Sequence, residues 1–279
     1  MFARRRRLML TLLLPPLLIY LGLVAFLYFA QTAMLFPVGQ VARGGPLPEG
    51  AEPLELRTAS GERLLGFHVP PARRRSERLL ILGFGGNAAG ASGTALDLHA
   101  LFPDADIVVF HYRGYAPSEG SPSAAAFRED ALRIHDFARA RFRPDRMIAV
   151  GFSVGSGVAA SLSAERDLDG LILVTPFDSL RRVASDQYWW APVRLLFRHE
   201  LEPVRDLRRN PTPVAILAGG RDDLVPGPRT QALRLAAPIL AFDRTITDAG
   251  HNDIYDHPDF ADAMRGALRR LRAMPRRAR

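Results

Sequence analysis

Apolar residues form one long run near the amino end of the chain and then a series of short runs separated by amphipathic stretches. The short runs predict buried strands and occupy residues 78–84, 106–114, 147–152, 171–174 and 214–219. Between them apolar residues recur at helical spacing, for example over 123–142. Repeated alternation of strand and helix is typical of a mostly parallel sheet with helices on both faces, so we expect an α/β fold.

Further elements are predicted at both ends of this alternating region. Residues 54–58 and 64–70 alternate in polarity on either side of a short turn and predict a hairpin that opens the sheet. Near the carboxyl end, the run 238–246 predicts a last strand, and helical spacing over 257–272 predicts a final helix. The sequence therefore predicts one domain over residues 54–272.

The long apolar run covers residues 8–30 and contains no charged residue. As a helix it extends about 34 Å at ~1.5 Å per residue, and the hydrocarbon core of a bilayer is about 30 Å thick. Pro15 and Pro16 interrupt it, which a membrane helix tolerates better than a soluble one. A cleaved signal peptide is the alternative, but its apolar core is usually shorter, and no A-x-A site follows this run. We expect residues 1–36 to be a basic segment and transmembrane anchor.

The basic residues around this run predict its orientation. Four arginines at 4–7 precede it, whereas Arg43 is the one basic residue in the twenty that follow. Basic residues stay on the cytoplasmic side, so we expect the amino terminus in the cytoplasm and the domain across the membrane, which is the periplasm in a bacterium. Residues 37–53, rich in proline and glycine, are expected to form a tether.

The formal net charge of +8 is concentrated at the two ends of the chain. Residues 4–7 and the stretch from 263 to the end carry more positive charge than this total, so the remainder is mildly acidic. Terminal charge of one sign is typical of a solvated or membrane-facing end, so we expect a basic tail at 273–279 and no nucleic-acid partner. The absence of cysteine excludes a disulfide scaffold, a thiolate metal site and a cysteine nucleophile.

Residues 151–155 read GFSVG, a G-x-S-x-G motif between an apolar strand and a helix of small residues. That context is the one a nucleophile elbow requires, because its serine occupies a sharp turn with little room around the backbone. The helix that begins there also favours developing negative charge at its amino end. An ordinary glycine–serine turn is the alternative, and the strand and helix around it favour Ser153 as a nucleophile.

A serine nucleophile needs a histidine base and a carboxylate that orients it, and in this fold they follow in the order serine, acid, histidine. Asp222 and Asp223 lie in a predicted strand-to-helix loop downstream of Ser153. His251 lies in the loop after the next strand, and His257, in or at the start of the predicted last helix, is the competing histidine. We expect His251 to be the base, whereas spacing alone does not choose between the two aspartates.

An oxyanion hole needs two backbone N–H groups, one from the residue after the serine and one from an earlier loop. The first is Val154, and the second comes from the glycine-rich loop 83–90, where Asn87 or Gly86 is the candidate. A nucleotide-binding loop is the alternative, but 83–90 lacks G-x-G-x-x-G and the chain has no lysine for a Walker motif. We expect Asn87 and Val154 to hold an oxyanion, and we expect no cofactor and no metal.

Six motifs together resemble the α/β-hydrolase superfamily. They are FGGNAAG (84–90), YRGYAPSEGSPS (112–123), GFSVGSG (151–157), TPFDSL (175–180), GGRDDLVP (219–226) and AGHNDI (249–254). More narrowly, the chain is similar to the single-pass anchored serine hydrolases of the bud-emergence family and their bacterial relatives. The similarity covers roughly residues 54–272, and YRGYAPSEGSPS is its most specific part.

This resemblance implies an eight-stranded sheet and a Ser-His-Asp triad. It also selects Asp222 as the acid, because the family acid stands four residues before the proline of this loop, here Pro226. One motif departs from the family pattern: where the family has His-Gly-Asn, this chain has glycine at 85. The oxyanion donors are backbone groups, so they do not depend on that histidine.

The 39 residues between the strand ending at 174 and the one starting at 214 are too few for a separate cap domain, so we expect an open site. Within them, the aromatic segment 188–197 predicts either an acyl-pocket wall or a helix packed on the sheet. A membrane anchor and an apolar patch near the serine indicate acyl esters or thioesters, lipid-derived or on acylated proteins.

The sequence thus predicts a membrane-anchored serine hydrolase that cleaves carboxylic esters or thioesters through Ser153, His251 and Asp222. A non-catalytic hydrolase-fold protein, acting as a scaffold or partner-binding module at the membrane, is the alternative. No expected triad or oxyanion residue lies before the glycine-rich loop 83–90, so we expect the anchor to supply location and not chemistry.

Overall fold

The computed structural model describes residues 2–41 and 44–276, with side chains from Thr11 onward. Residues 42–43 of the expected tether, which include the arginine used to orient the anchor, lie outside the described residues, as do 277–279 of the basic tail.

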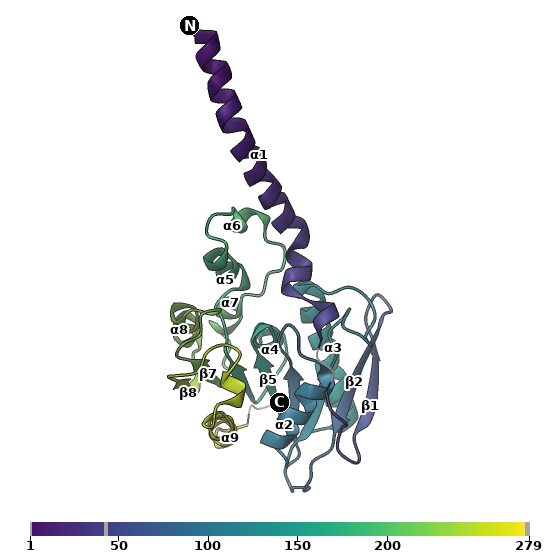
Figure 1. The fold of residues 1–279 in the computed structure, drawn as a ribbon. Helices are drawn as coiled ribbons and strands as arrows, with labels where there is room; N and C mark the ends of the chain where they lie inside the picture. Colours follow the sequence, from purple (N-terminus) through teal and green to yellow (C-terminus); the bar gives the residue numbers. More distant parts are fainter. Residues whose placement is uncertain (1, 42–43, 277–279) are drawn as a thin grey trace.

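Eight strands form one sheet in the order β1-β2-β4-β3-β5-β6-β7-β8 (Figure 1). The strands are β1 (Glu52–Arg57), β2 (Arg63–Val69), β3 (Leu79–Phe84), β4 (Asp106–Phe110), β5 (Arg146–Phe152), β6 (Gly170–Val174), β7 (Val214–Gly219) and β8 (Leu240–Ile246). β2 is antiparallel to both β1 and β4, and all other pairs are parallel. The expected mostly parallel, eight-stranded α/β-hydrolase sheet is confirmed.

Burial along the strands explains why their sequence patterns differ. Every residue of β3, β4, β5 and β6 is buried, because helices cover both faces of the central sheet. Their sequences are therefore continuous apolar runs. The edge strand β1 alternates between buried and exposed positions, as a half-covered strand does.

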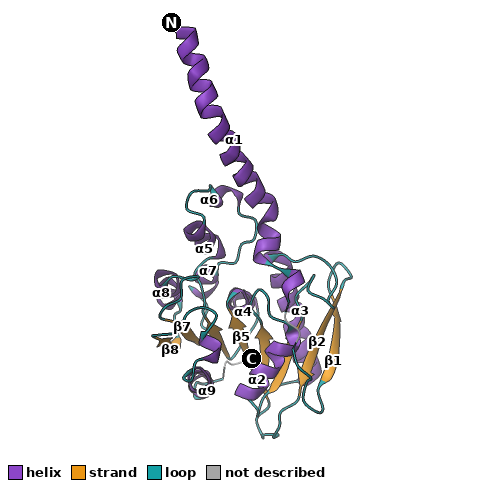
Figure 2. Cartoon of the chain, in the orientation of Figure 1, coloured by secondary structure: helices purple, strands orange, loops and turns teal. Residues whose placement is uncertain are grey.

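Helices cover the sheet on both faces (Figure 2). α3 (Ala124–Phe142), α4 (Val154–Glu165), α7 (Pro203–Leu207) and α8 (Gly227–Ala236) pack over one face. α2 (Ala91–Leu101) and α9 (Phe260–Arg272) pack over the other. Two short helices, α5 (Leu180–Gln187) and α6 (Val193–Leu196), rise from the end of β6 and leave the sheet. Loops therefore lie at the carboxyl ends of the parallel strands.

The predicted start of the last helix at His257 is wrong. α9 begins at Phe260, and a short 3-10 turn, η2 (Ile254–Asp256), precedes it. His257 has an extended backbone (φ −69°, ψ 136°). The physical reason is Pro258, because a proline ring clashes with a helical conformation of the residue before it.

The amino-terminal helix α1 (Phe2–Leu35) runs on through Pro15 and Pro16 and projects far beyond the rest of the molecule (Figure 1). Among the described residues, one helical segment, Thr11–Gln40, is long and apolar enough to cross a membrane, with a mean hydropathy of 2.2. Residues 11–23 are exposed, whereas Phe36 is 1% exposed within the hydrophobic core. The first part of α1 therefore extends beyond the domain, and its end packs against the domain.

Candidate active site

Ser153 occupies the sharp turn between β5 and α4, at the carboxyl end of the sheet. Its backbone adopts φ 49° and ψ −117°, a strained conformation for any residue with a Cβ. Its own N–H donates a 2.9 Å hydrogen bond to the carbonyl oxygen of Val174 on β6, which anchors the turn to the neighbouring strand. The turn holds the Ser153 side chain above the strand ends.

The two glycines of the G-x-S-x-G motif are required by close backbone contacts. A Cβ on Gly151 would overlap the carbonyl oxygen of Gly155. A Cβ on Gly155 would overlap the carbonyl oxygen of Phe84 at the end of β3. Any other residue at either position would push α4 away from the sheet and move Ser153 with it.

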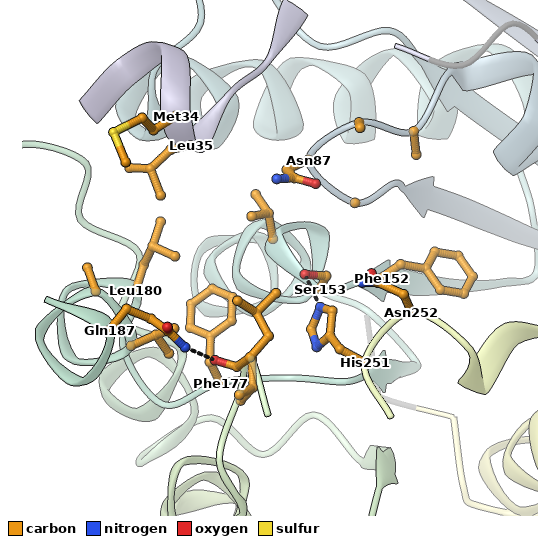
Figure 3. A pocket seen from close by; sticks show the side chains of 18 of the residues that line it. Met34, Leu35, Asn87, Phe152, Ser153, Phe177, Leu180, Gln187, His251 and Asn252 are labelled. Carbon is orange, nitrogen blue, oxygen red and sulfur yellow. Dashed lines mark hydrogen bonds between the residues drawn. The ribbon is translucent and has the colours of Figure 1, made fainter. Parts of the chain in front are cut away.

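Ser153, His251 and Asp222 are joined in one hydrogen-bonded chain. The hydroxyl oxygen of Ser153 lies 2.9 Å from Nε2 of His251 (Figure 3). Nδ1 of the same ring lies 2.8 Å from Oδ2 of Asp222. The three residues come from loops after β5, β7 and β8, at 153, 222 and 251, and the parallel strands bring them to one edge of the sheet.

The structure brings Asp222, and not Asp223, to the histidine. The Asp222 side chain is 5% exposed, and its Oδ1 accepts hydrogen bonds from the N–H groups of Leu224 (3.1 Å) and Val225 (2.7 Å). These bonds aim Oδ2 at His251. Asp223 is exposed.

The competing histidine, His257, does not take part in this chain. Its Nε2 lies 3.2 Å from Oδ1 of Asp248, and its Nδ1 accepts a hydrogen bond from the N–H of Asp259. These local contacts cap the connection into α9 and leave His251 as the histidine beside Ser153.

The predicted oxyanion loop between β3 and α2 passes directly over Ser153. A Cβ built on Gly86 would lie 3.8 Å from Cβ of Ser153. Val154 is the first residue of α4, so its N–H has no acceptor within the helix. Within the described part of the chain, the N–H groups of Gly86 and Asn87 donate no hydrogen bond either. Donors are thus available on both sides of the serine, as an oxyanion site requires.

Two tyrosines hold this loop in place, and sequence reasoning assigned them no role. The hydroxyl of Tyr112 donates a 2.9 Å hydrogen bond to the carbonyl oxygen of Gly85, and the hydroxyl of Tyr115 donates a 2.7 Å bond to that of Asn87. The Tyr112 ring stacks on Phe127 of α3 at 4.2 Å between centroids. Both belong to the YRGY stretch, whose specificity was the signal that marked them.

The glycine at position 85, which departs from the expected His-Gly-Asn pattern, fits tightly in its loop. A Cβ there would lie 2.9 Å from both Cβ of Ala89 and Oγ1 of Thr94. The loop therefore packs against the start of α2 and leaves no room for a side chain at 85. This close packing accounts for the glycine in this chain.

A cavity of about 820 Å³ opens beside Ser153. The site end contributes Gly86, Asn87, Ser153, Val154 and His251, and residues 188, 191–193, 196 and 197 of the aromatic segment form part of the wall. α1 contributes Val24, Leu27, Tyr28, Gln31, Met34 and Leu35. Figure 3 shows Met34 and Leu35 projecting from α1 across the cavity from Ser153.

The expectation that α1 supplies location and not chemistry stays a prediction, and the structure adds that α1 forms part of the cavity wall. Its last three turns present a stripe of side chains to the domain, and six of them line the cavity. A membrane-facing side chain and a cavity-facing side chain are both apolar, so composition could not distinguish them. The periodic burial of Val24, Leu27, Gln31 and Leu35 appears only in the folded chain.

No group of three or more histidine, aspartate or glutamate side chains that could hold a metal ion occurs among the described residues. The chemistry available at the site is that of the serine hydroxyl, the imidazole, the carboxylate and the backbone N–H groups.

Comparison with known proteins agrees with this architecture. A family model described as the alpha/beta hydrolase fold matches residues 79–201. An uncharacterized protein of Mycobacterium tuberculosis (strain ATCC 25618 / H37Rv) is 28% identical over 262 residues, which cover 90% of each chain. The lysophosphatidylserine lipase ABHD12 of Mus musculus is 28% identical over 228 residues, or 69% of this chain and 56% of the lipase.

Among solved structures, an esterase of Pyrococcus furiosus superposes with a TM-score of 0.68 at 15% identity, covering 84% of this chain and 96% of the esterase. A likeness at that identity shows the fold. Together with the family match and the strand order, it leads to one conclusion: this chain has the α/β-hydrolase fold.

Proposed function

We propose that this protein is a membrane-anchored serine hydrolase that cleaves carboxylic ester or thioester bonds through an acyl-enzyme intermediate. The observation that carries the proposal is the hydrogen-bonded chain from Ser153 through His251 to Asp222, with distances of 2.9 and 2.8 Å. This arrangement allows a neutral serine to become a nucleophile, because the histidine can accept its proton as attack proceeds.

In the first half of the reaction, the Ser153 hydroxyl oxygen attacks the carbonyl carbon while Nε2 of His251 takes its proton. Asp222 holds the ring orientation and stabilises the imidazolium that forms. The negative charge develops on the former carbonyl oxygen, between the backbone N–H groups of Val154 and Asn87. Collapse of this intermediate breaks the ester or thioester bond, and His251 returns the proton to the leaving group.

In the second half, water attacks the acyl group on Ser153. His251 now takes a proton from the water, and the same N–H groups hold the second oxyanion. Breakdown releases the carboxylic acid and returns the proton to Ser153. Each half of the reaction thus uses the same three side chains, and the proposed reaction consumes only the substrate and water.

The kind of bond is argued from the similar proteins and the cavity. An esterase and a lipase are among the proteins that this chain resembles, and the cavity beside Ser153 is lined mostly by apolar side chains. Both observations favour an acyl ester or thioester, on a small molecule, a lipid or an acylated protein.

Membrane anchoring by α1 is part of the proposal. The span Thr11–Gln40, preceded by arginines at 4–7, favours a cytoplasmic amino terminus with the catalytic domain of residues 54–272 on the opposite side. A reporter that is active only in the periplasm, fused after Arg279 in a bacterial host, is expected to be active. Activity from a reporter that works only in the cytoplasm would reverse the orientation.

A fluorophosphonate probe tests the chemistry, because it labels a serine only when a neighbouring base activates it. We expect labelling of the wild-type membrane protein and none of Ser153→Ala, with kcat for p-nitrophenyl acetate lowered by about 10⁴ to 10⁶. The exposed Ser76→Ala is the matched control and should label like the wild type. An unlabelled wild type that is folded would favour a scaffold role for the domain.

A further inference from the structure

The cavity extends along α1 into the part of the helix that is apolar enough to span a membrane. Its lining reaches from Leu35 to Val24, a distance of about 16 Å along the helix axis at ~1.5 Å per residue. Val24 and Leu27 lie inside the run 8–30 that contains no charge. One helix thus presents one face to the surroundings and another to the space beside Ser153.

Specific contacts join α1 to the domain at this cavity. The side-chain amide of Gln31 donates to the carbonyl oxygen of Leu196 (3.1 Å) and accepts from the N–H of Arg198 (2.9 Å). Oγ1 of Thr32 lies 2.8 Å from Nε2 of His199. These hydrogen bonds fix the position of the end of α1 against the domain. The part of the cavity wall that α1 provides is therefore a fixed part of the site.

Segment 188–197 forms another part of the cavity wall and carries exposed apolar side chains. Trp189 and Leu195 are 82% and 85% exposed. The hydroxyl of Tyr20, within the span, donates a 3.3 Å hydrogen bond to the carbonyl oxygen of Trp190, and their rings meet edge to face. With α1 spanning the membrane as proposed above, the contact at Tyr20 places this segment at the level of the bilayer, where exposed tryptophan is favourable.

We infer that α1 and segment 188–197 form a lateral entrance from the bilayer, and that a long acyl chain of a membrane lipid ester lies along Val24, Leu27 and Leu35 with its carbonyl at Ser153. The inference rests on the proposed function and adds the substrate class and a binding role for the membrane helix. A chain that enters this way exchanges one apolar environment for another, so the entrance needs no aqueous path.

The test compares Leu27→Trp, which fills the cavity, with Leu18→Trp, the same substitution on an exposed part of α1 that does not line it. For Leu27→Trp in the full chain in detergent, we expect kcat/KM for p-nitrophenyl palmitate to fall about tenfold or more. In the same variant, hydrolysis of p-nitrophenyl acetate and fluorophosphonate labelling should fall much less than palmitate hydrolysis, because an acetyl group is too short to extend along α1. Leu18→Trp should leave all three unchanged. Unchanged palmitate hydrolysis in Leu27→Trp would overturn the inference.

A second experiment uses the unaltered protein in vesicles of phosphatidylcholine. A long-chain alkyl fluorophosphonate with a photoreactive group at the end of its chain is attached to Ser153 and then irradiated. We expect cross-links to residues 24–35 of α1. Cross-links confined to α2 or α9, on the far side of Ser153, would overturn the inference while leaving the serine chemistry intact. Failure of the probe to label Ser153 at all would instead contradict the proposed function.

Discussion

The hydroxyl of Tyr115 donates a 2.7 Å hydrogen bond to the carbonyl oxygen of Asn87, 28 residues earlier in the chain. Tyr115 is 1% exposed, and burial raises the pKa of its phenol above the ordinary value, so the group stays protonated and remains a donor. A tyrosine of the β4–α3 loop thus holds Asn87, whose backbone N–H is a proposed oxyanion donor.

Removal of this hydroxyl should impair catalysis more than binding. For Tyr115→Phe we expect kcat for p-nitrophenyl acetate to fall about tenfold with KM within about twofold, because a displaced Asn87 N–H weakens stabilisation formed in the transition state. Tyr20→Phe removes a hydroxyl hydrogen bond far from Ser153 and is the control. Equal changes in kcat and KM, or a loss that follows thermal stability alone, would assign Tyr115 a merely structural role.

The two neighbouring aspartates should differ sharply. Asp222→Asn should lower kcat by about 10⁴, because the amide can hold His251 in the wrong tautomer. Asp223→Asn should keep activity within about twofold, since its side chain is exposed. Steady-state ester hydrolysis by both purified variants measures the difference. Similar losses in the two variants would require another acid.

The turn at Ser153 predicts a large stability difference between two glycine substitutions. Gly155→Ala places a methyl group into the carbonyl oxygen of Phe84 and should destabilise the domain by about 2–4 kcal/mol. Gly93→Ala in α2 meets only an ordinary 3.9 Å contact and should be neutral or slightly stabilising. Unfolding in detergent measures both. A Gly155→Ala protein as stable as wild type would mean that the turn can relax.

Two truncations separate the exposed part of α1 from the part that packs against the domain. Deletion of residues 1–23 retains Val24 onward and should preserve hydrolysis of p-nitrophenyl acetate. Deletion of residues 1–36 also removes Phe36, whose ring lies 4.8 Å from that of Phe127, and should cost about 3 kcal/mol or more in unfolding free energy. If the two truncated proteins unfolded at the same temperature, residues 24–36 would contribute nothing to the stability of the domain.

His199 should make stability depend on pH. Burial lowers the pKa of its imidazole, and the charge of Arg198 lowers it further. The unfolded chain therefore binds this proton more readily than the folded one, so stability is retained above the ordinary pKa of about 6.5 and lost as pH falls below it. His199→Gln keeps a polar partner for Thr32 but cannot titrate. Between pH 7.5 and pH 5, the unfolding temperature of this variant should fall less than that of the wild type. An equal fall in the two proteins would contradict the assignment to His199.

Local chemistry along the chain was sufficient to predict the mostly parallel sheet and the sharp turn at Ser153. A continuous apolar run means a strand covered on both faces, and glycines around a serine between strand and helix mean a sharp turn, because both follow from interactions among near neighbours. The helix start at His257 was misplaced because a proline one residue later outweighs a helical pattern.

The remaining features depend on contacts between residues far apart in sequence. Asp222 and Asp223 are adjacent, and only the two N–H groups at 224 and 225 decide which carboxylate faces His251. The role of Tyr115 depends on a carbonyl group in another loop.

The sequence by itself determined that residues 8–30 are apolar enough for a bilayer and that alternating strands and helices form a mostly parallel sheet, since both follow from composition and period. Only the tertiary structure decided that the end of α1 is a wall of the site. Both lipid and an acyl-binding cavity favour apolar side chains, so the sequence does not show which of the two an apolar residue of α1 faces. The packing of α1 against segment 188–197 shows it.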